Sequence, residues 1–268
     1  MEFRSESSRA GRRVMQHWAS ILDVSSISKS FGGLRAITEL SLSVAHGEIL
    51  GLVGPNGAGK SVFINLVCGL YMPTAGTIQL NGEDITALPS YRRARLGIGR
   101  TYQNIRLLSR MTVLENVLVA SRQQVTQPLR AAFSRSGKAE AAKAMRLLEQ
   151  VQLVDKADHV SGSLAYGEAR RLEIVRALMG SPRLLFLDEP AAGMNEQEME
   201  ELSQSIRVCQ SQVDAIVIVD HDMTFMQNLA DNLVVMDAGM KIAEGVPKQV
   251  LADPRVIEAY LGVEDAAA

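Results

Sequence analysis

The chain contains 268 residues, of which 47% are hydrophobic and 22% charged, so it can bury a full core in one large domain or two small ones. Its formal net charge of −2 gives no electrostatic basis for binding nucleic acid. The sequence has no run of about 18 apolar residues and therefore predicts no membrane-spanning helix. Cys68 and Cys209 have neither disulfide nor metal-ligand spacing, which indicates two reduced thiols.

Residues 1–19 are expected to form a disordered polar tail. Their arginines are not followed by the apolar segment that a secretory signal requires. Attraction of these arginines to anionic lipid is an alternative role, and Met15 is a second candidate for the true start. A short tail, residues 264–268, is expected at the other end.

The first part of the folded region is expected to combine an antiparallel sheet with a buried parallel strand. From Ile21 to Val44, apolar and polar residues alternate, which predicts strands with one wet face. The apolar run Ile49–Val53 is typical of a strand buried on both faces, and Val62–Leu70 has helical spacing. Thr77–Leu80, between turn signals, predicts a further short strand.

The region from about residue 104 to 170 is expected to be a helical subdomain inserted into the core. Val113–Ala120 and Lys138–Val151 are predicted helices, because their apolar residues recur on one helical face. Ser121–Gly137, which is polar and contains Pro128, is predicted to be a loop.

The rest of the chain is expected to complete an α/β core. Leu184–Leu187 and Ala215–Val219 are continuous apolar runs, typical of strands buried on both faces. The other expected elements are a helix at Glu196–Val208, a strand at Leu233–Met236, and helices at Pro247–Leu251 and Val256–Leu261.

Residues Gly54–Ser61 read Gly-Pro-Asn-Gly-Ala-Gly-Lys-Ser and fit the phosphate-binding pattern G-x-x-x-x-G-K-[ST]. They lie between a predicted strand and a predicted helix, which is the context that this motif requires. Backbone N–H groups of such a loop surround phosphate oxygens. Lys60 would reach the β- and γ-phosphates, and the Ser61 hydroxyl would bind Mg²⁺. The sequence therefore predicts binding of a nucleoside triphosphate.

Two further patterns point to hydrolysis. Asp188 and Glu189 end a predicted buried strand, where open α/β sheets bind ligands. Asp188 would hold Mg²⁺ through water and Glu189 would orient and deprotonate the attacking water; a solvated helix-cap cluster is the alternative.

Gly167 stands near the start of a predicted helix and offers free N–H groups to an anion. One site rarely needs two such termini, which suggests a γ-phosphate contact across a dimer.

Together these motifs resemble the ATP-binding subunit of an ABC transporter. Gly54–Ser61 match the Walker A motif, Leu184–Glu189 the Walker B motif and Leu164–Glu168 the family signature. The resemblance covers roughly Ile21 to Gly262, with all motifs in family order. It implies a P-loop NTPase fold over residues 20–263, with an antiparallel β subdomain and the inserted helical subdomain.

The resemblance implies roles for single residues as well. Gln103 fits the Q-loop, Asn195 the D-loop and His221 the switch histidine, whereas Phe31 stands where an aromatic ring stacks on adenine. Alternatively, Phe31 is a core residue and His221 a loop cap. The implied catalytic residues are Glu189, His221 and Lys60. The implied Mg²⁺ ligands are Ser61, Gln103 and Asp188. The implied ATP-binding residues are Phe31, Gly54, Pro55, Asn56, Gly57, Ala58, Gly59, Lys60, Ser61, Val62 and Gln103. The signature residues that would act on the opposite subunit's nucleotide are Leu164, Ala165, Tyr166, Gly167 and Glu168.

Departures from the common pattern narrow the resemblance. Ala165 replaces the signature serine, Glu168 the usual glutamine, Val62 a frequent threonine and Asn195 the D-loop aspartate. Ala165, the run Ala191–Asn195, the triplet His221–Met223 and the closing Ala259–Gly262 segment together resemble one branch, the ATPases of high-affinity branched-chain amino acid importers.

That branch implies ATP and Mg²⁺ as cofactors, a second ATP-binding subunit, two transmembrane permease subunits and, indirectly, a periplasmic or extracellular substrate-binding protein. It also implies a peripheral position on the cytoplasmic face of the membrane and no nucleic-acid partner. Tyr102, Gln103 and Leu107–Val113 are the candidate docking surface. The alternatives are an exporter ATPase for lipid or lipopolysaccharide, a soluble ABC ATPase acting on ribosomes or DNA and, more remotely, a P-loop kinase. The transported molecule and the identity of the second subunit are not encoded in any motif.

Overall fold

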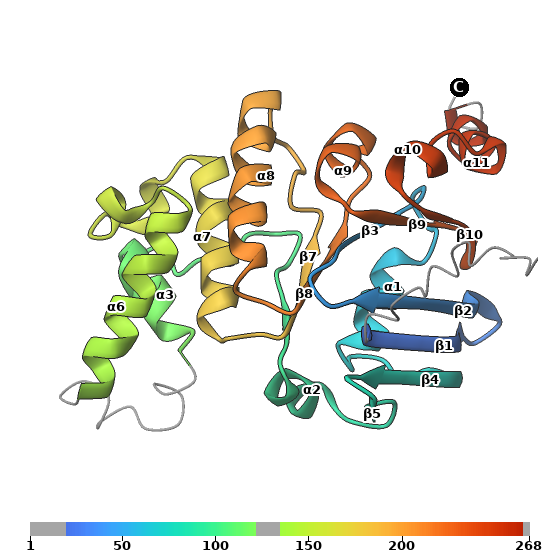
Figure 1. Ribbon diagram of the computed structural model, residues 1–268, viewed down its shortest axis with the longest axis horizontal. Helices are drawn as coiled ribbons and strands as arrows, with labels where there is room; N and C mark the ends of the chain where they lie inside the picture. The colour runs from blue at the N-terminus through green and yellow to red at the C-terminus, as the bar shows by residue number, and fades with distance from the viewer. Residues whose placement is uncertain (1–19, 122–134, 265–268) are drawn as a thin grey trace, which may run out of the picture.

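The computed structural model describes residues 20–121 and 135–264, which form two β-sheets and a group of helices (Figure 1). The larger sheet has six strands in the order β10-β9-β3-β8-β7-β6. All neighbouring pairs in it are parallel except β9 and β10. Its strands are β3 (Ile49–Val53), β6 (Ile98–Arg100), β7 (Leu184–Asp188), β8 (Ala215–Val219), β9 (Asn232–Asp237) and β10 (Met240–Gly245).

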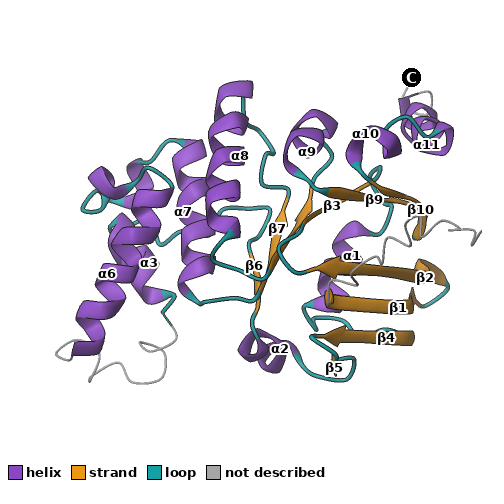
Figure 2. Ribbon diagram, viewed as in Figure 1, coloured by secondary structure: helices purple, strands orange, loops and turns teal. Residues whose placement is uncertain are grey.

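The smaller sheet is antiparallel, with the order β2-β1-β4-β5. Residues of β1 and β2 alternate between buried and exposed over part of their length, as the sequence predicted for strands with one wet face. Figure 2 shows this sheet beside the central one, on the side away from the large helices. Its strands are β1 (Ser20–Phe31), β2 (Leu34–Ala45), β4 (Ala75–Leu80) and β5 (Glu83–Asp84).

The central strands bury both faces because each face packs on its own hydrophobic core. Every residue of β3, β7 and β8 is buried. In β7, Leu185 and Leu187 pack into a core with the helices, whereas Leu184 and Phe186 pack into a second core with the antiparallel sheet. This alternation explains why these segments read as continuous apolar runs.

Most of the longer helices lie on one side of the sheets. The helices α3, α6 and α7 pack together at one end of the molecule, and α8 lies beside α7 (Figures 1 and 2). The helix α3 begins with a capping box in which Thr112 accepts a hydrogen bond from the Glu115 N–H. The helices are α1 (Lys60–Val67), α2 (Ser90–Leu96), α3 (Val113–Val119), α6 (Arg135–Gln150), α7 (Tyr166–Met179), α8 (Glu196–Gln210), α9 (Met223–Leu229), α10 (Pro247–Val250) and α11 (Pro254–Glu264).

Several predicted boundaries differ from the observed ones. The first helix ends at Val67 rather than Leu70, since Gly69 has a positive φ of 74°. The helix α6 starts at Arg135, so the predicted loop up to Gly137 ended too late. The short elements α2, β6 and α9 were not predicted. The predicted C-terminal tail, 264–268, starts one residue too early, since α11 extends to Glu264. The rest of that tail, the predicted tail at 1–19 with Met15, and most of the predicted loop around Pro128 lie outside the described residues.

Candidate functional site

The phosphate-binding loop connects β3 to α1, as the motif requires. Two of its glycines are needed for steric reasons. A Cβ on Gly54, where φ is 152°, would lie 2.1 Å from the Met236 carbonyl oxygen, and one on Gly59, where φ is 100°, would lie 2.7 Å from that of Ala36. The loop therefore packs tightly on β9 and β2, and larger residues at these two positions would displace its N–H groups.

A cavity of about 330 Å³ opens over this loop, a size that suits a small-molecule ligand. It brings together residues from the antiparallel sheet, the loop and the end of β7. The lining residues are Phe31, Leu34, Arg35, Ala36, Asn56, Gly57, Ala58, Gly59, Lys60, Ser61, Val62 and Glu189. Most of the predicted ATP-binding residues therefore surround one space.

Lys60 lies at the start of α1 and is only 7% exposed. Its ammonium group donates hydrogen bonds to the carbonyl oxygens of Gly54 at 2.5 Å and Pro55 at 2.9 Å. Burial lowers the pKa of Lys60, while the nearby carboxylates of Glu189, Asp220 and Asp188 oppose that decrease. The cation of the phosphate loop is thus within electrostatic range of three acidic groups.

Two of these acidic groups, Asp188 and Glu189, stand where β7 ends. Asp188 is the last residue of the strand and is buried, whereas Glu189 is half-buried and has a positive φ of 45°. The Glu189 N–H donates a 2.7 Å hydrogen bond to the carbonyl of Val219, the last residue of the neighbouring strand β8. Because the chain turns at Glu189, its carboxylate reaches the cavity while Asp188 stays in the sheet.

Gln103 meets Glu189 directly. Its side-chain amide donates a 2.6 Å hydrogen bond to Glu189 Oε2. Residues 86 positions apart are thereby joined at the rim of the cavity, although Gln103 itself does not line it. The predicted Mg²⁺ and ATP contacts of Gln103 remain predictions, and they require this hydrogen bond to give way or to be shared.

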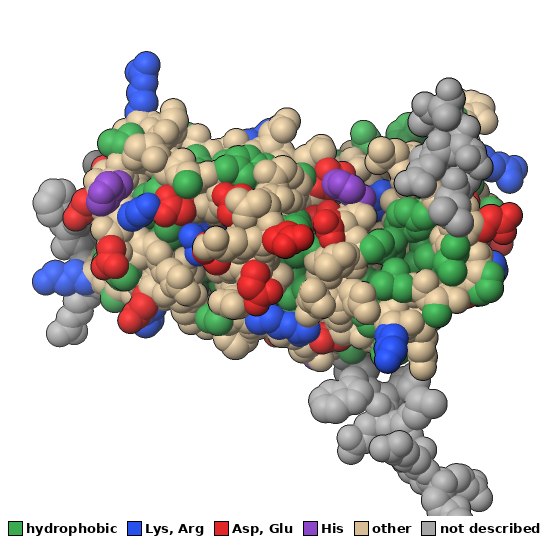
Figure 3. All heavy atoms as spheres, turned by 90° about the horizontal axis from the view of Figure 1, so that it is seen from above, with side chains coloured by type: hydrophobic (Ala, Val, Ile, Leu, Met, Phe, Trp, Pro, Cys, Tyr) green, Lys and Arg blue, Asp and Glu red, His purple; other side chains and the backbone are tan. Residues whose placement is uncertain are grey.

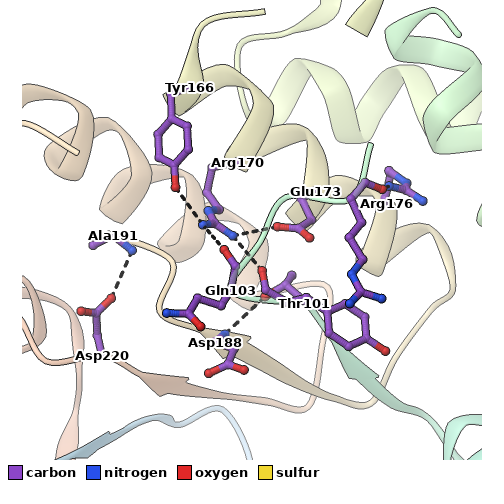
Figure 4. Close-up of polar contacts among 11 residues, drawn as sticks. Thr101, Gln103, Tyr166, Arg170, Glu173, Arg176, Asp188, Ala191 and Asp220 are labelled. Carbon is purple, nitrogen blue, oxygen red and sulfur yellow. Dashed lines mark hydrogen bonds and ion pairs between the residues drawn. The ribbon is translucent and has the colours of Figure 1, made fainter. Parts of the chain in front are cut away.

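His221 lies two residues after the end of β8, and its side chain is 61% exposed. The preceding Asp220 is fully buried and accepts hydrogen bonds from the backbone N–H groups of Ala191 at 3.1 Å and His221 at 2.8 Å. Asp220 therefore joins the segment after β7 to the segment after β8, as Figure 4 shows for Ala191. Asp220 was not predicted as a site residue, although a carboxylate at the end of a buried strand is the same signal that identified Asp188.

The signature segment lies at the start of α7 and does not line the cavity. Ala165 precedes the helix and has no side-chain acceptor, so only half of a capping box forms: Glu168 accepts a 3.1 Å hydrogen bond from the Ala165 N–H. Burial raises the pKa of Glu168, but this hydrogen bond and an ion pair with Lys156 together bring it below its usual value. Glu168 is therefore occupied within its own chain, whereas Tyr166 is 44% exposed.

A buried arginine behind the signature connects it to Gln103. Arg170 is fully buried and donates to the backbone carbonyls of Tyr102 at 2.9 Å and Gln103 at 2.8 Å, and to the Tyr166 hydroxyl at 3.2 Å (Figure 4). It also pairs with Glu173 at 2.9 Å. Arg170 was not predicted, because an arginine within a helix carries no local signal for a buried role.

Two of the remaining predicted residues have clear local contacts. Asn195 caps α8, accepting a 3.0 Å hydrogen bond from the Glu198 N–H. Phe31 is 41% exposed, lines the cavity and meets the ring of Tyr71 edge-on at 5.1 Å between centroids. This exposure does not fit the alternative of a core residue for Phe31, and stacking on adenine remains a prediction.

The residues present suit a magnesium ion that is shared with a nucleotide. Ser61, Gln103 and Asp188 offer hydroxyl, amide and carboxylate oxygens, the hard donors that Mg²⁺ prefers. Among the described residues, no group of three or more His, Cys, Asp or Glu could hold a metal ion. The protein thus supplies few ligands of its own, which fits an ion completed by phosphate oxygens and water.

Comparison with known proteins gives a consistent result. Residues 37–192 match the family model described as ABC transporter, and residues 240–266 match that of the branched-chain amino acid ATP-binding cassette transporter. The chain is 41% identical to the high-affinity branched-chain amino acid transport ATP-binding protein BraF of Pseudomonas aeruginosa, over 90% of this chain and 98% of the relative. It is 39% identical to the corresponding protein LivG of Escherichia coli, with the same coverage.

Solved structures agree with these matches. The fold is similar to that of MJ1267, an ATP-binding cassette of an ABC transporter, in its ADP conformation, with a TM-score of 0.80 and 31% identity over 91% of this chain and 99% of that chain. A nucleotide-free ATP-binding cassette from an ABC transporter gives a TM-score of 0.79 and 31% identity over 90% and 98%.

Proposed function

Since this chain belongs to the ABC transporter family of ATP-binding subunits, we propose that its ATPase activity powers the import of branched-chain or related amino acids. The observation that carries the proposal is the convergence of Lys60, Glu189 and the phosphate loop on one cavity. Asp188 and His221 complete this group at the ends of β7 and β8. This arrangement supports phosphoryl transfer from ATP to water rather than simple nucleotide storage.

In the proposed reaction each residue has one task. The loop N–H groups and Lys60 hold the phosphates, and Lys60 exchanges its present carbonyl partners for phosphate oxygens. Glu189 orients the attacking water and accepts its proton, and His221 contacts the γ-phosphate. Ser61, Gln103 and Asp188 would hold Mg²⁺, which would neutralise charge on the phosphate oxygens. Most of the catalysis is electrostatic.

A second ATP-binding subunit completes each site. The signature segment does not line the cavity of its own chain, and Glu168 is held by Lys156 and the Ala165 N–H. The free N–H groups near Gly167 are therefore available to the γ-phosphate bound by a partner subunit, in a head-to-tail pair. The partner is either a second copy of this chain or a related one.

The permease subunits are proposed to dock around Tyr102 and Gln103 and along Leu107–Val113. Beside this segment is a surface hollow of about 280 Å³, and two aromatic side chains, Tyr91 and Tyr102, line it and are exposed. Exposed aromatic rings are common in protein interfaces. Within the described residues no helix is both long enough and apolar enough to span a membrane. On the basis of its transport relatives, we propose that the chain is a peripheral subunit on the cytoplasmic face of the inner or plasma membrane.

The choice of substrate rests on the relatives rather than on the ATP site. BraF and LivG are named as branched-chain amino acid transport ATP-binding proteins, and the family model that matches residues 240–266 is also described by branched-chain amino acids. An extracellular or periplasmic binding protein and the permease would select the amino acid, so this chain need not contact it. Leucine, isoleucine and valine are the proposed substrates.

The rival functions fit the surface less well. A soluble ABC ATPase that acts on ribosomes or DNA would need a basic surface for phosphate backbones. Figure 3 shows acidic and basic side chains interspersed on the face seen from above, rather than a continuous basic patch. The helix α8 begins with an acidic segment that contains Glu196, Glu198, Glu200 and Glu201. The lipid exporter alternative shares the ATP site and is separated by the substrate experiment below.

The test is uptake by cells that carry a single altered residue. We expect the Glu189→Gln variant to abolish uptake of radiolabelled leucine, isoleucine and valine, whereas Glu149→Gln, an exposed carboxylate on α6, leaves uptake unchanged. Affinity purification from native membranes in mild detergent should recover two polytopic permeases and an ATP-binding subunit. Normal amino acid uptake in the Glu189 variant, or a chain found only with ribosomes or nucleic acid, would refute import.

A further inference from the structure

Arg100 is the last residue of β6 and lies against the Walker B carboxylate. Its Nη2 donates a 2.8 Å hydrogen bond to Asp188 Oδ2, and the two side chains are 13% and 9% exposed. Hydrogen bonds between charged groups are the stronger ones. One carboxylate oxygen of Asp188 is therefore held by Arg100, which leaves the other oxygen for a metal-bound water.

The same guanidinium holds a second element of the site. Its Nη1 donates a 2.6 Å hydrogen bond to Asn65 Oδ1, and Asn65 belongs to α1, the helix that begins at Lys60. Asp188 and Ser61, two of the proposed Mg²⁺ ligands, are thus carried by elements that Arg100 joins. Figure 4 shows the Asp188 carboxylate directed away from the Arg170 network, so the two arginines act at different places.

The other side of Arg100 faces the surface. Its guanidinium lies 5.2 Å from the ring centroid of Tyr102, and both residues line two surface hollows of about 280 and 260 Å³. Arg100 therefore extends from the surface proposed for permease docking to the carboxylate proposed to hold Mg²⁺.

We propose that Arg100 is a positioning residue that fixes Asp188 and α1 in the arrangement that binds Mg²⁺ with ATP. This inference rests on the Mg²⁺ role proposed above for Asp188. Residues that hold metal ligands in place affect metal affinity when they are replaced, by about 10–100-fold. A purely structural ion pair between β6 and β7 would instead affect folding and leave metal dependence unchanged.

The experiment measures binding of a fluorescent ATP analogue during a MgCl₂ titration and, separately, in EDTA. For Arg100→Met we expect the half-saturating Mg²⁺ concentration to rise by about tenfold or more, with binding in EDTA within about twofold of the original. Arg100→Lys keeps the charge but cannot bridge both partners, so its shift should be intermediate. Arg183→Met is the matched control, because it removes an arginine–aspartate pair, with Asp214, near the other end of β7.

Each outcome decides between the explanations. An unchanged Mg²⁺ dependence in Arg100→Met, or an equal shift in Arg183→Met, overturns the positioning role. If Arg100→Met does not fold, an unchanged dependence in Arg100→Lys overturns it in the same way. Asp188→Asn separates the two proposals: if it also leaves the Mg²⁺ dependence unchanged, the metal role of Asp188 fails; if it alone shifts the dependence, only the role of Arg100 fails.

Discussion

The phosphate loop and the signature segment, the two proposed phosphate-contacting sites of this protein, are built in opposite ways. The phosphate loop follows a strand buried on both faces, and its Lys60 is 7% exposed and faces carboxylates from two neighbouring strand ends. The signature segment begins a helix at the other side, where Tyr166 is 44% exposed and the contacts come from behind, through Arg170.

This difference indicates which site is complete within one chain. The phosphate loop has its cation, carboxylates and cavity in place, so it can bind nucleotide without a partner. The signature segment does not line this cavity, so under the proposed mechanism we expect it to act on a phosphate that another subunit brings to it. Replacements in the two sites should therefore separate nucleotide binding from turnover.

The largest expected effect is on turnover when Glu189 is replaced. Glu189→Gln keeps the shape and can still contact Gln103, but it cannot accept the proton of the attacking water. We expect ATP hydrolysis to fall by about 10²–10⁴-fold while ATP affinity stays nearly intact, measured by phosphate release and equilibrium binding. Unchanged hydrolysis would rule out the general-base role.

A smaller effect, on binding itself, is expected at Lys60. Lys60→Ala removes a cation whose hydrogen bonds to phosphate are worth about 1.5–3 kcal/mol, so ATP affinity should fall by about 10–100-fold. Lys241→Ala, which removes an exposed lysine paired with Glu244, should leave affinity unchanged in the same titration. Normal affinity in the Lys60 variant would contradict the assignment of the phosphate loop.

Gly167 tests the signature side of the comparison. A Cβ at this position would find its nearest neighbour, the Glu198 side chain, at 3.4 Å, so an added Cβ does not clash within the isolated chain. Gly167→Val would nevertheless place a side chain where a partner's phosphate approaches. We expect thermal unfolding and ATP binding by the monomer to be unchanged and hydrolysis to fall by about tenfold. A loss of monomer binding instead would show that the signature acts on its own chain's nucleotide.

How much could be predicted from the sequence depended on whether a residue's role leaves a pattern among its neighbours in the chain. The runs Leu184–Leu187 and Ala215–Val219 predicted buried strands correctly, because burial on both faces leaves a local pattern. Local patterns also placed the phosphate loop and Asp188. Arg170 and Asp220 were missed, since each acts through partners far away in the sequence, the Tyr102 carbonyl for Arg170 and the Ala191 N–H for Asp220. Such contacts arise only when the chain has folded.

The smallest expected effect concerns the far end of the cavity, at Phe31. Its ring is partly exposed and edge-on to Tyr71, so removing it should cost little stability. Stacking of a base on an aromatic ring is worth about 1–3 kcal/mol, so Phe31→Ala should weaken ATP binding by about tenfold. Inorganic triphosphate, which has no base, should bind this variant normally, and Phe31→Trp should restore ATP affinity. Leu34→Ala, on the same wall of the cavity, is the control for a general loss of apolar contact. If triphosphate binding fell as much as ATP binding, Phe31 would act on the loop and not on the base.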